Sequence, residues 1–179
     1  MAGKGTRLRP FTLTCPKPLL QINDKPIVEH LIDQITSKLT TKIEEIIYIL
    51  GDEAYFNSDV VTSLTLIAKK YNAKTKVYRQ LDQLGTGHAI MCAEDSLEGP
   101  SIIAYADTMI QGQISIDSDV DGIIWVKKVE NPSSYGVVKL DEKQNITDLI
   151  EKPQDYISDL AVVGIYYFKD ISIIKNELK

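Results

Sequence analysis

The sequence predicts an α/β fold, doubly wound and Rossmann-like, with a mixed sheet that carries an added antiparallel part. In the first half of the chain, apolar runs of strand length alternate with stretches of helical periodicity. In the second half, short strand-like runs are separated by tight turns, which is typical of antiparallel strands. The 179 residues, 44% hydrophobic and 25% charged, match a globular domain that can bury a sizeable core.

The first half is expected to contain three helices and three strands. Asp24-Lys25-Pro26 opens a helix of about 26–39, with the proline near its first turn. Residues 43–50 end in a dense apolar run that is typical of a buried strand. Ser58 can cap a second helix, whose apolar side chains face inward. The other elements expected here are a strand at Lys76–Arg79, a helix at 86–97 and a strand at Ile102–Ala106.

The second half is expected to be mainly antiparallel. Strands are predicted at 122–128, 136–140, 146–150 and 161–168. Asp141–Asn145 is expected to form a hairpin turn, and Trp125 is expected in the core. A short helix from about Asp170 ends the chain.

Composition and charge exclude several classes of protein. No apolar run reaches the roughly 18 residues of a membrane span, and the N-terminus lacks a signal-peptide core. The two cysteines are too few for a disulfide framework, so a reduced, cytoplasmic protein is expected. The net charge of −5 argues against nucleic-acid binding. Because residues 1–25 alone carry +4, a small anionic ligand is expected there.

The opening loop is the sharpest local signal. In Gly3-Lys4-Gly5-Thr6-Arg7, the glycines allow backbone N–H groups to approach phosphate oxygens, and Arg7 can grip a polyphosphate with two parallel hydrogen bonds. The loop matches neither the Walker A pattern nor G-x-G-x-x-G. A flexible, solvated N-terminus is an equally good interpretation of these residues alone.

Two further charged residues are candidates for phosphate or metal chemistry. Lys17 lies between two prolines, which restrict the backbone and reduce the entropy lost when its ammonium binds a phosphate. Asp107 follows an apolar strand, at the edge where α/β proteins bind ligands, and a carboxylate there suits Mg²⁺. A turn or helix-capping role for Asp107 is the alternative.

Several motifs occur in the order typical of one family. They are GTRLRP-x-T-x₃-PKPLL-x₄-KP-x₂-EH, then Gln80–Ala89, Ile102–Asp107, Tyr135–Val138, Glu151-Lys152-Pro153 and Val163–Tyr167. Together they resemble the sugar-1-phosphate nucleotidyltransferases, including glucose-1-phosphate thymidylyltransferase-like enzymes. The resemblance implies one nucleotidyltransferase domain over 1–179, with a nucleotide-binding half at 1–110 and a sugar-phosphate-binding half at 111–179.

The family resemblance also implies roles for individual residues. Arg7, Lys17 and Asp107 would be catalytic, and Asp107 would hold the cofactor Mg²⁺. The nucleotide-binding residues would be Ala2, Gly3, Gly5, Thr6, Arg7, Gln80, Gly85 and Thr86. The sugar-phosphate-binding residues would be Tyr135, Gly136, Glu151 and Lys152. Without the resemblance, Gln80 reads as an exposed strand-end residue near Gln83, and Glu151-Lys152 as a surface ion pair. Sequence periodicity gives His88 a packing role in its helix.

The implied reaction joins an NTP and a sugar 1-phosphate to give an NDP-sugar and pyrophosphate, for polysaccharide biosynthesis in the cytoplasm. Gln80 and Gly85 suit a pyrimidine, so dTTP or UTP with glucose 1-phosphate is favoured, although GTP- and mannose-using relatives share the PKPLL segment. No nucleic acid or membrane partner is expected. The sequence leaves homo-oligomerisation open.

Two departures from the family pattern define the alternatives. The family places an apolar strand before the glycine loop and a second metal-binding aspartate near the C-terminus, and neither occurs here. Met1 is therefore expected to be an internal residue of a longer protein, or the chain an inactive fragment. A non-catalytic nucleotide-sugar-binding or regulatory module is the main alternative function, and a small-molecule kinase ranks third.

Overall fold

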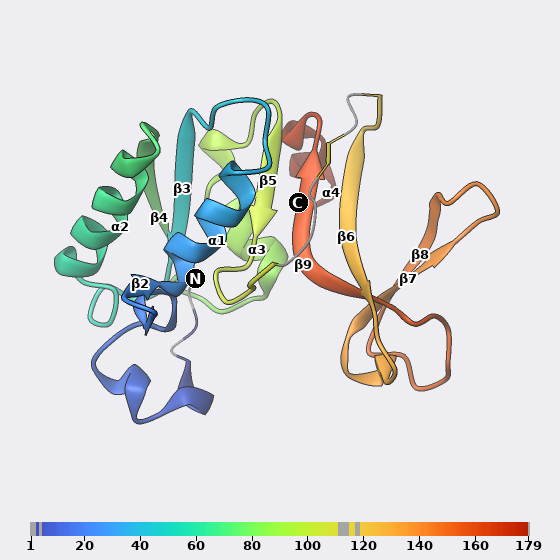
Figure 1. Cartoon of the computed structure of the whole chain (residues 1–179), viewed down its shortest axis with the longest axis horizontal. Coiled ribbons are helices and arrows are strands. Elements are labelled where there is room, and N and C mark those ends of the chain that lie inside the picture. The colour runs from blue at the N-terminus through green and yellow to red at the C-terminus, as the bar shows by residue number, and fades with distance from the viewer. Residues whose placement is uncertain (1–2, 4, 111–114, 117–118, 179) are drawn as a thin grey trace.

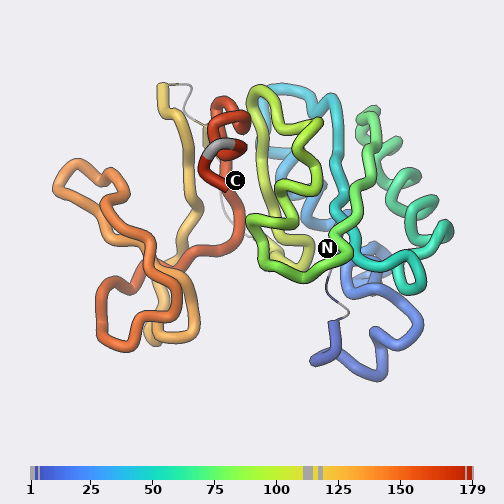
Figure 2. Tube along the Cα trace, turned by 180° about the vertical axis from the view of Figure 1, so that it is seen from behind, coloured from blue at the N-terminus to red at the C-terminus, as the bar shows by residue number. Residues whose placement is uncertain are grey.

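The computed structural model describes residues 3, 5–110, 115–116 and 119–178 (Figure 1). The helices and the two parallel strands of the N-terminal half lie at one end of the molecule, and the antiparallel strands of the C-terminal half lie toward the other end. Figure 2 shows the same arrangement from behind, with the C-terminal segment between the two ends.

Strands β3 (Glu45–Leu50) and β4 (Lys74–Arg79) pair in parallel with Glu45 opposite Lys74. The helices α1 (Ile27–Thr36) and α2 (Ser58–Lys70) pack against them. Their apolar residues recur at helical spacing, so one face of each helix is buried. The resulting core cluster contains Val28, Ile32, Tyr48, Leu50, Phe56, Val60, Leu64, Ile67 and Ala68.

The cap of α2 is Asn57, whereas the sequence predicts Ser58, so that prediction is wrong. The Asn57 Oδ1 accepts hydrogen bonds from the backbone N–H groups of Asp59, at 3.1 Å, and Val60, at 3.2 Å. A serine and an asparagine are both good caps, and here the chain enters its first helical turn at Ser58.

Helix α1 begins after Pro26 and ends at Thr36, which is shorter than the predicted span of 26–39. The Thr36 hydroxyl donates to the carbonyl oxygens of Ile32 and Asp33, and the Ser37 hydroxyl donates to that of Gln34. Side-chain bonds of this kind compete with the helical pattern and favour a helix end.

A polar network ties α1 to its neighbours. Lys70 at the end of α2 forms an ion pair with the buried Glu29, with Nζ 2.7 Å from Oε1. Asp33 accepts hydrogen bonds from Tyr71 and from Lys25. Lys25 belongs to β2 (Lys25–Pro26), which pairs antiparallel with β1 (Gln21–Ile22).

The predicted helix over 86–97 is divided. Helix α3 (Thr86–Met91) ends early, and a 3₁₀ turn follows over Glu94–Ser96. The Ser96 hydroxyl lies 3.0 Å from Lys76 Nζ and 2.7 Å from Tyr78 Oη. These contacts with β4 hold the end of the segment against the sheet. They join residues distant in the sequence, so local periodicity does not predict them.

The second sheet is antiparallel and contains strands from both halves of the chain. Strand β9 (Leu160–Phe168) pairs with β5 (Ser101–Ala104), with β6 (Gly122–Lys128) and, at Ala161, with β7. Strands β7 (Gly136–Leu140) and β8 (Ile146–Glu151) form the predicted hairpin, in which Asp141 accepts hydrogen bonds from the backbone of Lys143 and Asn145. A 3₁₀ turn and the short helix α4 (Ile174–Glu177) follow β9.

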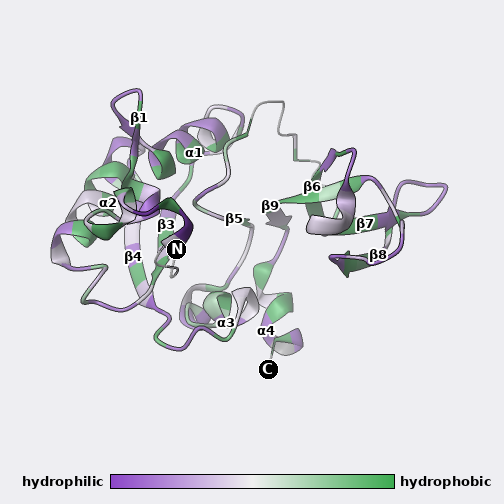
Figure 3. Ribbon diagram, turned by 90° about the horizontal axis from the view of Figure 1, so that it is seen from below, coloured by the Kyte–Doolittle hydropathy of each residue, from purple (hydrophilic) through white to green (hydrophobic). Residues whose placement is uncertain are grey.

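The predicted combination of parallel and antiparallel strands is confirmed, although the described strands form three sheets instead of one. Helix α1 joins the parallel pair to the second sheet, because its Leu31 and Ile35 pack with Ile165 of β9. Trp125 packs partly buried against this second cluster. Figure 3 shows β7 and β8 set apart from the helices. Among the described residues, no helix has both the length and the apolar character that crossing a membrane requires.

Candidate active site

A cavity of about 600 Å³ lies where the N-terminal loop meets the end of β5. Its volume is in the range that small-molecule ligands occupy. Six of the predicted site residues line it, namely Gly3, Gly5, Thr6, Arg7, Lys17 and Asp107. Among the described residues, Leu8, Pro18, Gln83 and the segment Ala104–Ala106 also line it. Ala2, predicted to belong to the same loop, lies outside the described residues, as does Lys4.

Gly5 has a left-handed backbone with φ +61°, and it precedes a 3₁₀ turn over Thr6–Leu8. A Cβ at this position would lie 3.0 Å from the Thr12 Cγ2. The buried Thr12 donates a hydrogen bond of 2.7 Å to the Gly5 carbonyl oxygen. Glycine is therefore required both for the turn and for the close approach.

Tyr55 anchors this loop to the core. Its hydroxyl donates to the carbonyl oxygen of Thr12 at 2.6 Å. Burial raises the pKa of Tyr55, so the hydroxyl remains protonated and able to donate at neutral pH. The glycine loop is thus held in position by a residue that precedes α2.

Lys17 and Asp107 meet across the cavity. The Lys17 Nζ lies 2.6 Å from Asp107 Oδ2, and the two side chains are 32% and 50% exposed. Lys17 begins a 3₁₀ turn over Lys17–Leu19, and the neighbouring Pro18 is buried, which fixes the backbone as the paired prolines predict. An exposed ion pair is weak, so an incoming phosphate or cation can separate these two groups.

The segment that carries Asp107 is held against β9. The Tyr105 N–H donates to the Gly164 carbonyl oxygen at 3.1 Å, and the Thr108 hydroxyl donates to that of Val163 at 3.3 Å. Gly164 has φ +80°, and a Cβ there would lie 2.6 Å from Tyr105 Cδ2. The glycine therefore admits the tyrosine ring, which lines the cavity just before Asp107.

The other predicted nucleotide-binding residues, Gln80, Gly85 and Thr86, do not line the 600 Å³ cavity. Gln80 is 5% exposed, and its backbone N–H donates to the Leu50 carbonyl oxygen at 2.7 Å. Its side-chain Nε2 lies 2.8 Å from the Gly85 carbonyl oxygen. Thr86 begins α3. In this structure Gln83, three residues further along, is the glutamine that reaches the cavity.

The predicted sugar-phosphate residues form a separate group on the β7–β8 hairpin. Gly136 lies opposite Glu151 in the strand register, and the Lys152 N–H donates to the Tyr135 carbonyl oxygen at 3.0 Å. A Cβ at Gly136 would lie 2.9 Å from Glu151 Oε2, so glycine leaves room for the carboxylate. The Lys152 Nζ is 3.6 Å from Glu151 Oε1, and both side chains are well exposed. None of these four residues lines the 600 Å³ cavity.

The described residues contain no cluster of three or more histidine, cysteine, aspartate or glutamate side chains that could enclose a metal ion by themselves. Mg²⁺ usually binds to one or two carboxylates together with substrate phosphates. Asp107 fits such a site, because its carboxylate lies in the same cavity as the glycine loop and Arg7.

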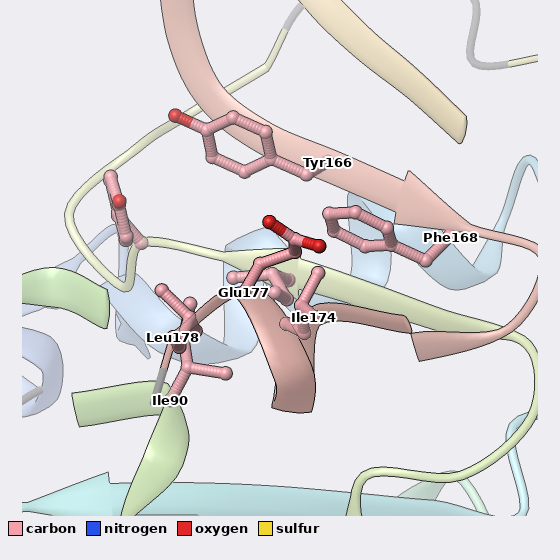
Figure 4. A pocket seen from close by; sticks show the side chains of 8 residues that line it. Ile90, Tyr166, Phe168, Ile174, Glu177 and Leu178 are labelled. Carbon is pink, nitrogen blue, oxygen red and sulfur yellow. The ribbon is translucent and has the colours of Figure 1, made fainter. Parts of the chain in front are cut away.

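A smaller apolar cavity of about 210 Å³ is also lined by Tyr105. Residues of α3, β5, β9 and α4 line it, and Figure 4 shows Glu177 with its carboxylate directed toward Tyr166 and Phe168. Burial raises the pKa of Tyr166 to about 12.

Sequence reasoning does not single out the contact between Tyr105 and Gly164 or the contact between Gln80 and His88. Each contact joins residues that share no local sequence pattern.

Comparison with known families decides the classification. A family model described as nucleotidyl transferase matches residues 1–179. The chain belongs to this family. It is 34% identical over 171 residues to the bifunctional protein GlmU of Methanococcus aeolicus, covering 94% of this chain and 39% of that protein. It is 31% identical over 188 residues to the mannose-1-phosphate guanylyltransferase catalytic subunit beta of Drosophila melanogaster, covering 100% of this chain and 49% of the other.

The chain thus spans less than half the length of these two relatives. A solved structure of UDP-glucose pyrophosphorylase complexed with UDP-glucose has a TM-score of 0.73 and 26% identity, covering 99% of this chain and 76% of that one. These likenesses confirm the predicted family and the predicted α/β fold class.

Proposed function

We propose that this chain catalyses nucleotidyl transfer between an NTP and a sugar 1-phosphate. A phosphate oxygen of the sugar 1-phosphate attacks the α-phosphorus of the NTP and forms a new P–O bond. The bond from the α-phosphorus to the bridging oxygen breaks, and pyrophosphate leaves with those electrons. The observation that carries the proposal is the meeting of the glycine loop, Arg7, Lys17 and Asp107 in one cavity.

The reaction needs no protein nucleophile, so catalysis rests on positioning and on neutralising charge. Backbone N–H groups near Gly3 and Gly5 would bind phosphate oxygens. Arg7 would stabilise the departing pyrophosphate. Lys17 would break its ion pair with Asp107, and its ammonium would then contact the reacting phosphates. Each role follows from a cation that lines the cavity and is open to substrate.

Asp107, together with substrate phosphates, would hold Mg²⁺. The bound ion would supply a positive charge that neutralises the phosphate oxygens. Release of Asp107 from Lys17 frees the carboxylate for this purpose, and the same movement frees the ammonium for the substrate.

The sugar 1-phosphate would bind at the β7–β8 hairpin. Lys152 would contact its phosphate, Glu151 would accept hydrogen bonds from sugar hydroxyls, and Tyr135 beside Gly136 would lie against the ring. These groups are outside the 600 Å³ cavity, so the proposal requires the hairpin to approach the cavity when both substrates are bound.

For the substrates, we favour dTTP or UTP with glucose 1-phosphate. The likeness to a UDP-glucose pyrophosphorylase supports a pyrimidine nucleotide, and the likeness to a mannose-1-phosphate guanylyltransferase makes GTP the alternative. The product NDP-sugar would serve polysaccharide synthesis, and the reaction would take place in the cytoplasm, where NTPs are available. Homo-oligomerisation is compatible with this proposal and is not needed for it.

A nucleotide-sugar-binding module without catalysis is the second candidate. It is favoured by one observation, the separation of the Lys152 group from the Asp107 cavity. In that case the chain would bind NTP or NDP-sugar with no turnover.

Pyrophosphate release by the purified chain tests the proposal. The chain and Mg²⁺ are incubated with each of dTTP, UTP, GTP, CTP and ATP, paired with the 1-phosphates of glucose, mannose and N-acetylglucosamine. We expect release that depends on the sugar phosphate and is fastest for one pair. Folded protein that binds nucleotide but releases no pyrophosphate with any pair would contradict the proposed activity and support the binding module.

A further inference from the structure

The Gln80 carboxamide is held by two acceptors on its nitrogen side. Its Nε2 lies 2.8 Å from the Gly85 carbonyl oxygen and 3.1 Å from His88 Nδ1. A backbone carbonyl oxygen can only accept, so the end of the carboxamide that faces Gly85 must be the NH₂ group. The two hydrogens of this group then point at two different acceptors.

This arrangement also determines which ring nitrogen of His88 carries the hydrogen. The amide NH₂ has no lone pair to offer, so His88 Nδ1 has to accept the hydrogen bond and must be unprotonated. The imidazole is therefore neutral with its hydrogen on Nε2. His88 follows Gly85 by less than one helical turn, on α3, so the short loop and the helix place both acceptors on the same side of Gln80.

Rotating the carboxamide would be unfavourable. The carbonyl Oε1 would then face the lone pairs of Gly85 and His88, and the NH₂ would lose both partners. Gln80 is 5% exposed, and its backbone is bound to Leu50 at the end of β3, so the side chain cannot move away easily. The described hydrogen bonds of Gln80 use its two nitrogens and leave Oε1 as an acceptor.

We propose that His88 is a positioning residue that makes Gln80 present only its carbonyl oxygen to a nucleobase. This inference rests on the proposed nucleotidyl transfer. The base favoured would carry an N–H on its ring, as uracil, thymine and guanine do, whereas cytosine and adenine have a ring nitrogen that can only accept. Space for a base exists beside the loop, because a Cβ at Gly85 would meet no atom of the described residues within 4 Å.

The first test is the protonation of the His88 ring, which does not depend on activity. The chain has two histidines, and the other one, His30, has Nε2 2.8 Å from the Ile22 carbonyl oxygen. Nitrogen-15 NMR above about pH 8, where imidazole is neutral, distinguishes Nδ1–H from Nε2–H. The signals lost in His88→Asn identify the ring. We expect Nε2–H for His88, and Nδ1–H would overturn the inference.

The second test uses a matched pair of variants. His88→Asn keeps an acceptor close to the position of Nδ1, whereas His88→Leu removes it. Without the acceptor, only the Gly85 carbonyl oxygen still opposes rotation of the carboxamide. We therefore expect the ratio of kcat/KM for UTP to that for CTP to fall about tenfold, the scale for one lost hydrogen bond. His88→Asn should keep the ratio within a few-fold. His30→Asn is the control and should not change the ratio, because His30 contacts the Ile22 carbonyl oxygen and not Gln80.

The outcomes separate this inference from the proposed function. An equal loss of turnover with every NTP in His88→Leu, at an unchanged ratio, would show a structural role alone and overturn the inference. If the wild-type chain binds NTPs but turns none over, the proposed function fails, and the ratio of Kd values for UTP and CTP in the same variants decides the inference. A wild-type chain that prefers CTP or ATP overturns it while leaving nucleotidyl transfer intact. Absence of binding to all five NTPs contradicts both.

Discussion

Single residues shape the candidate site in two ways: glycines allow close contact with neighbouring side chains, and charged side chains line the cavity. Gly5 and Gly164 each hold a left-handed backbone where a Cβ would collide with a neighbour. Arg7 and Lys17 bring positive charge to a cavity that also contains the Asp107 carboxylate. The function of these residues depends on their exact position, so we expect their substitution to lower turnover or stability strongly.

Replacing Arg7 by alanine should lower kcat about 100-fold or more, the scale for losing a preorganised charge at a reacting phosphate. Arg9→Ala is the matched control, because Arg9 lies two residues away and does not line the cavity. Steady-state pyrophosphate release measures both. A loss of less than a few-fold in Arg7→Ala, or an equal loss in Arg9→Ala, would remove Arg7 from the mechanism.

Replacing Gly164 by alanine should destabilise the fold by about 2 to 4 kcal/mol, from backbone strain and from overpacking against Tyr105. Gly99→Ala is the control, since Gly99 has φ +65° but a Cβ there would meet no atom within 4 Å in the part of the chain that the structure describes. That variant should cost only about 1 to 2 kcal/mol. Urea unfolding monitored by circular dichroism gives both values, and equal losses would show that the tyrosine contact is unimportant.

At the scale of elements, the sequence predicts most of the helices and strands because their local patterns agree with their burial. The apolar runs of β3 and β9 and the turn residues at Asp141–Asn145 are signals of this kind. Where the prediction fails, a distant partner or a competing local bond decides. The predicted helix over 86–97 is divided, and Ser96 in its second part contacts Lys76 and Tyr78. The cap of α2 is Asn57 instead of Ser58.

The cap can be tested by a pair of substitutions. Asn57→Ala should reduce the free energy of unfolding by about 1 kcal/mol, because two backbone N–H groups lose their acceptor. Ser58→Ala should change it by less than about 0.5 kcal/mol, as expected for an exposed position with no such bond. Urea titration of both variants decides between the residues, and the reverse order would contradict the structure.

The network around α1 predicts an acid dependence of stability. Partial burial alone would raise the pKa of Asp33, but hydrogen bonds from Lys25 and Tyr71 outweigh it and hold the pKa below the ordinary 3.8. The stabilisation is therefore fully present above pH 3.8 and is lost as the pH falls through the lower, folded-state pKa.

Asp33→Asn should therefore show a weaker fall in unfolding free energy than the wild type as the pH is lowered below about 4. Asp82→Asn, which removes an exposed carboxylate from a loop, should keep the wild-type dependence. Urea unfolding at a series of pH values makes the comparison. An identical slope in Asp33→Asn and the wild type would show that Asp33 does not contribute.

At the scale of the whole molecule, the sequence places Arg7, Lys17 and Asp107 together through their motifs, and the structure brings them into one cavity. The sequence cannot predict how the parallel pair and the antiparallel sheet are oriented, because that orientation depends on contacts such as Leu31 and Ile35 against Ile165. The hairpin group at Glu151-Lys152 is assembled as a unit but lies outside the cavity. The proposed catalysis therefore requires the two groups to meet on one pair of substrates.

The most direct test of the account is ³¹P NMR of the chain with UTP, glucose 1-phosphate and Mg²⁺, repeated with the pair that the substrate panel favours. We expect the signals of an NDP-sugar and pyrophosphate to grow together. They should stop growing when a chelator removes Mg²⁺, and should be absent with Asp107→Asn. Persistence of both substrates beside folded, nucleotide-binding protein, or release of phosphate without an NDP-sugar, would contradict nucleotidyl transfer by this chain.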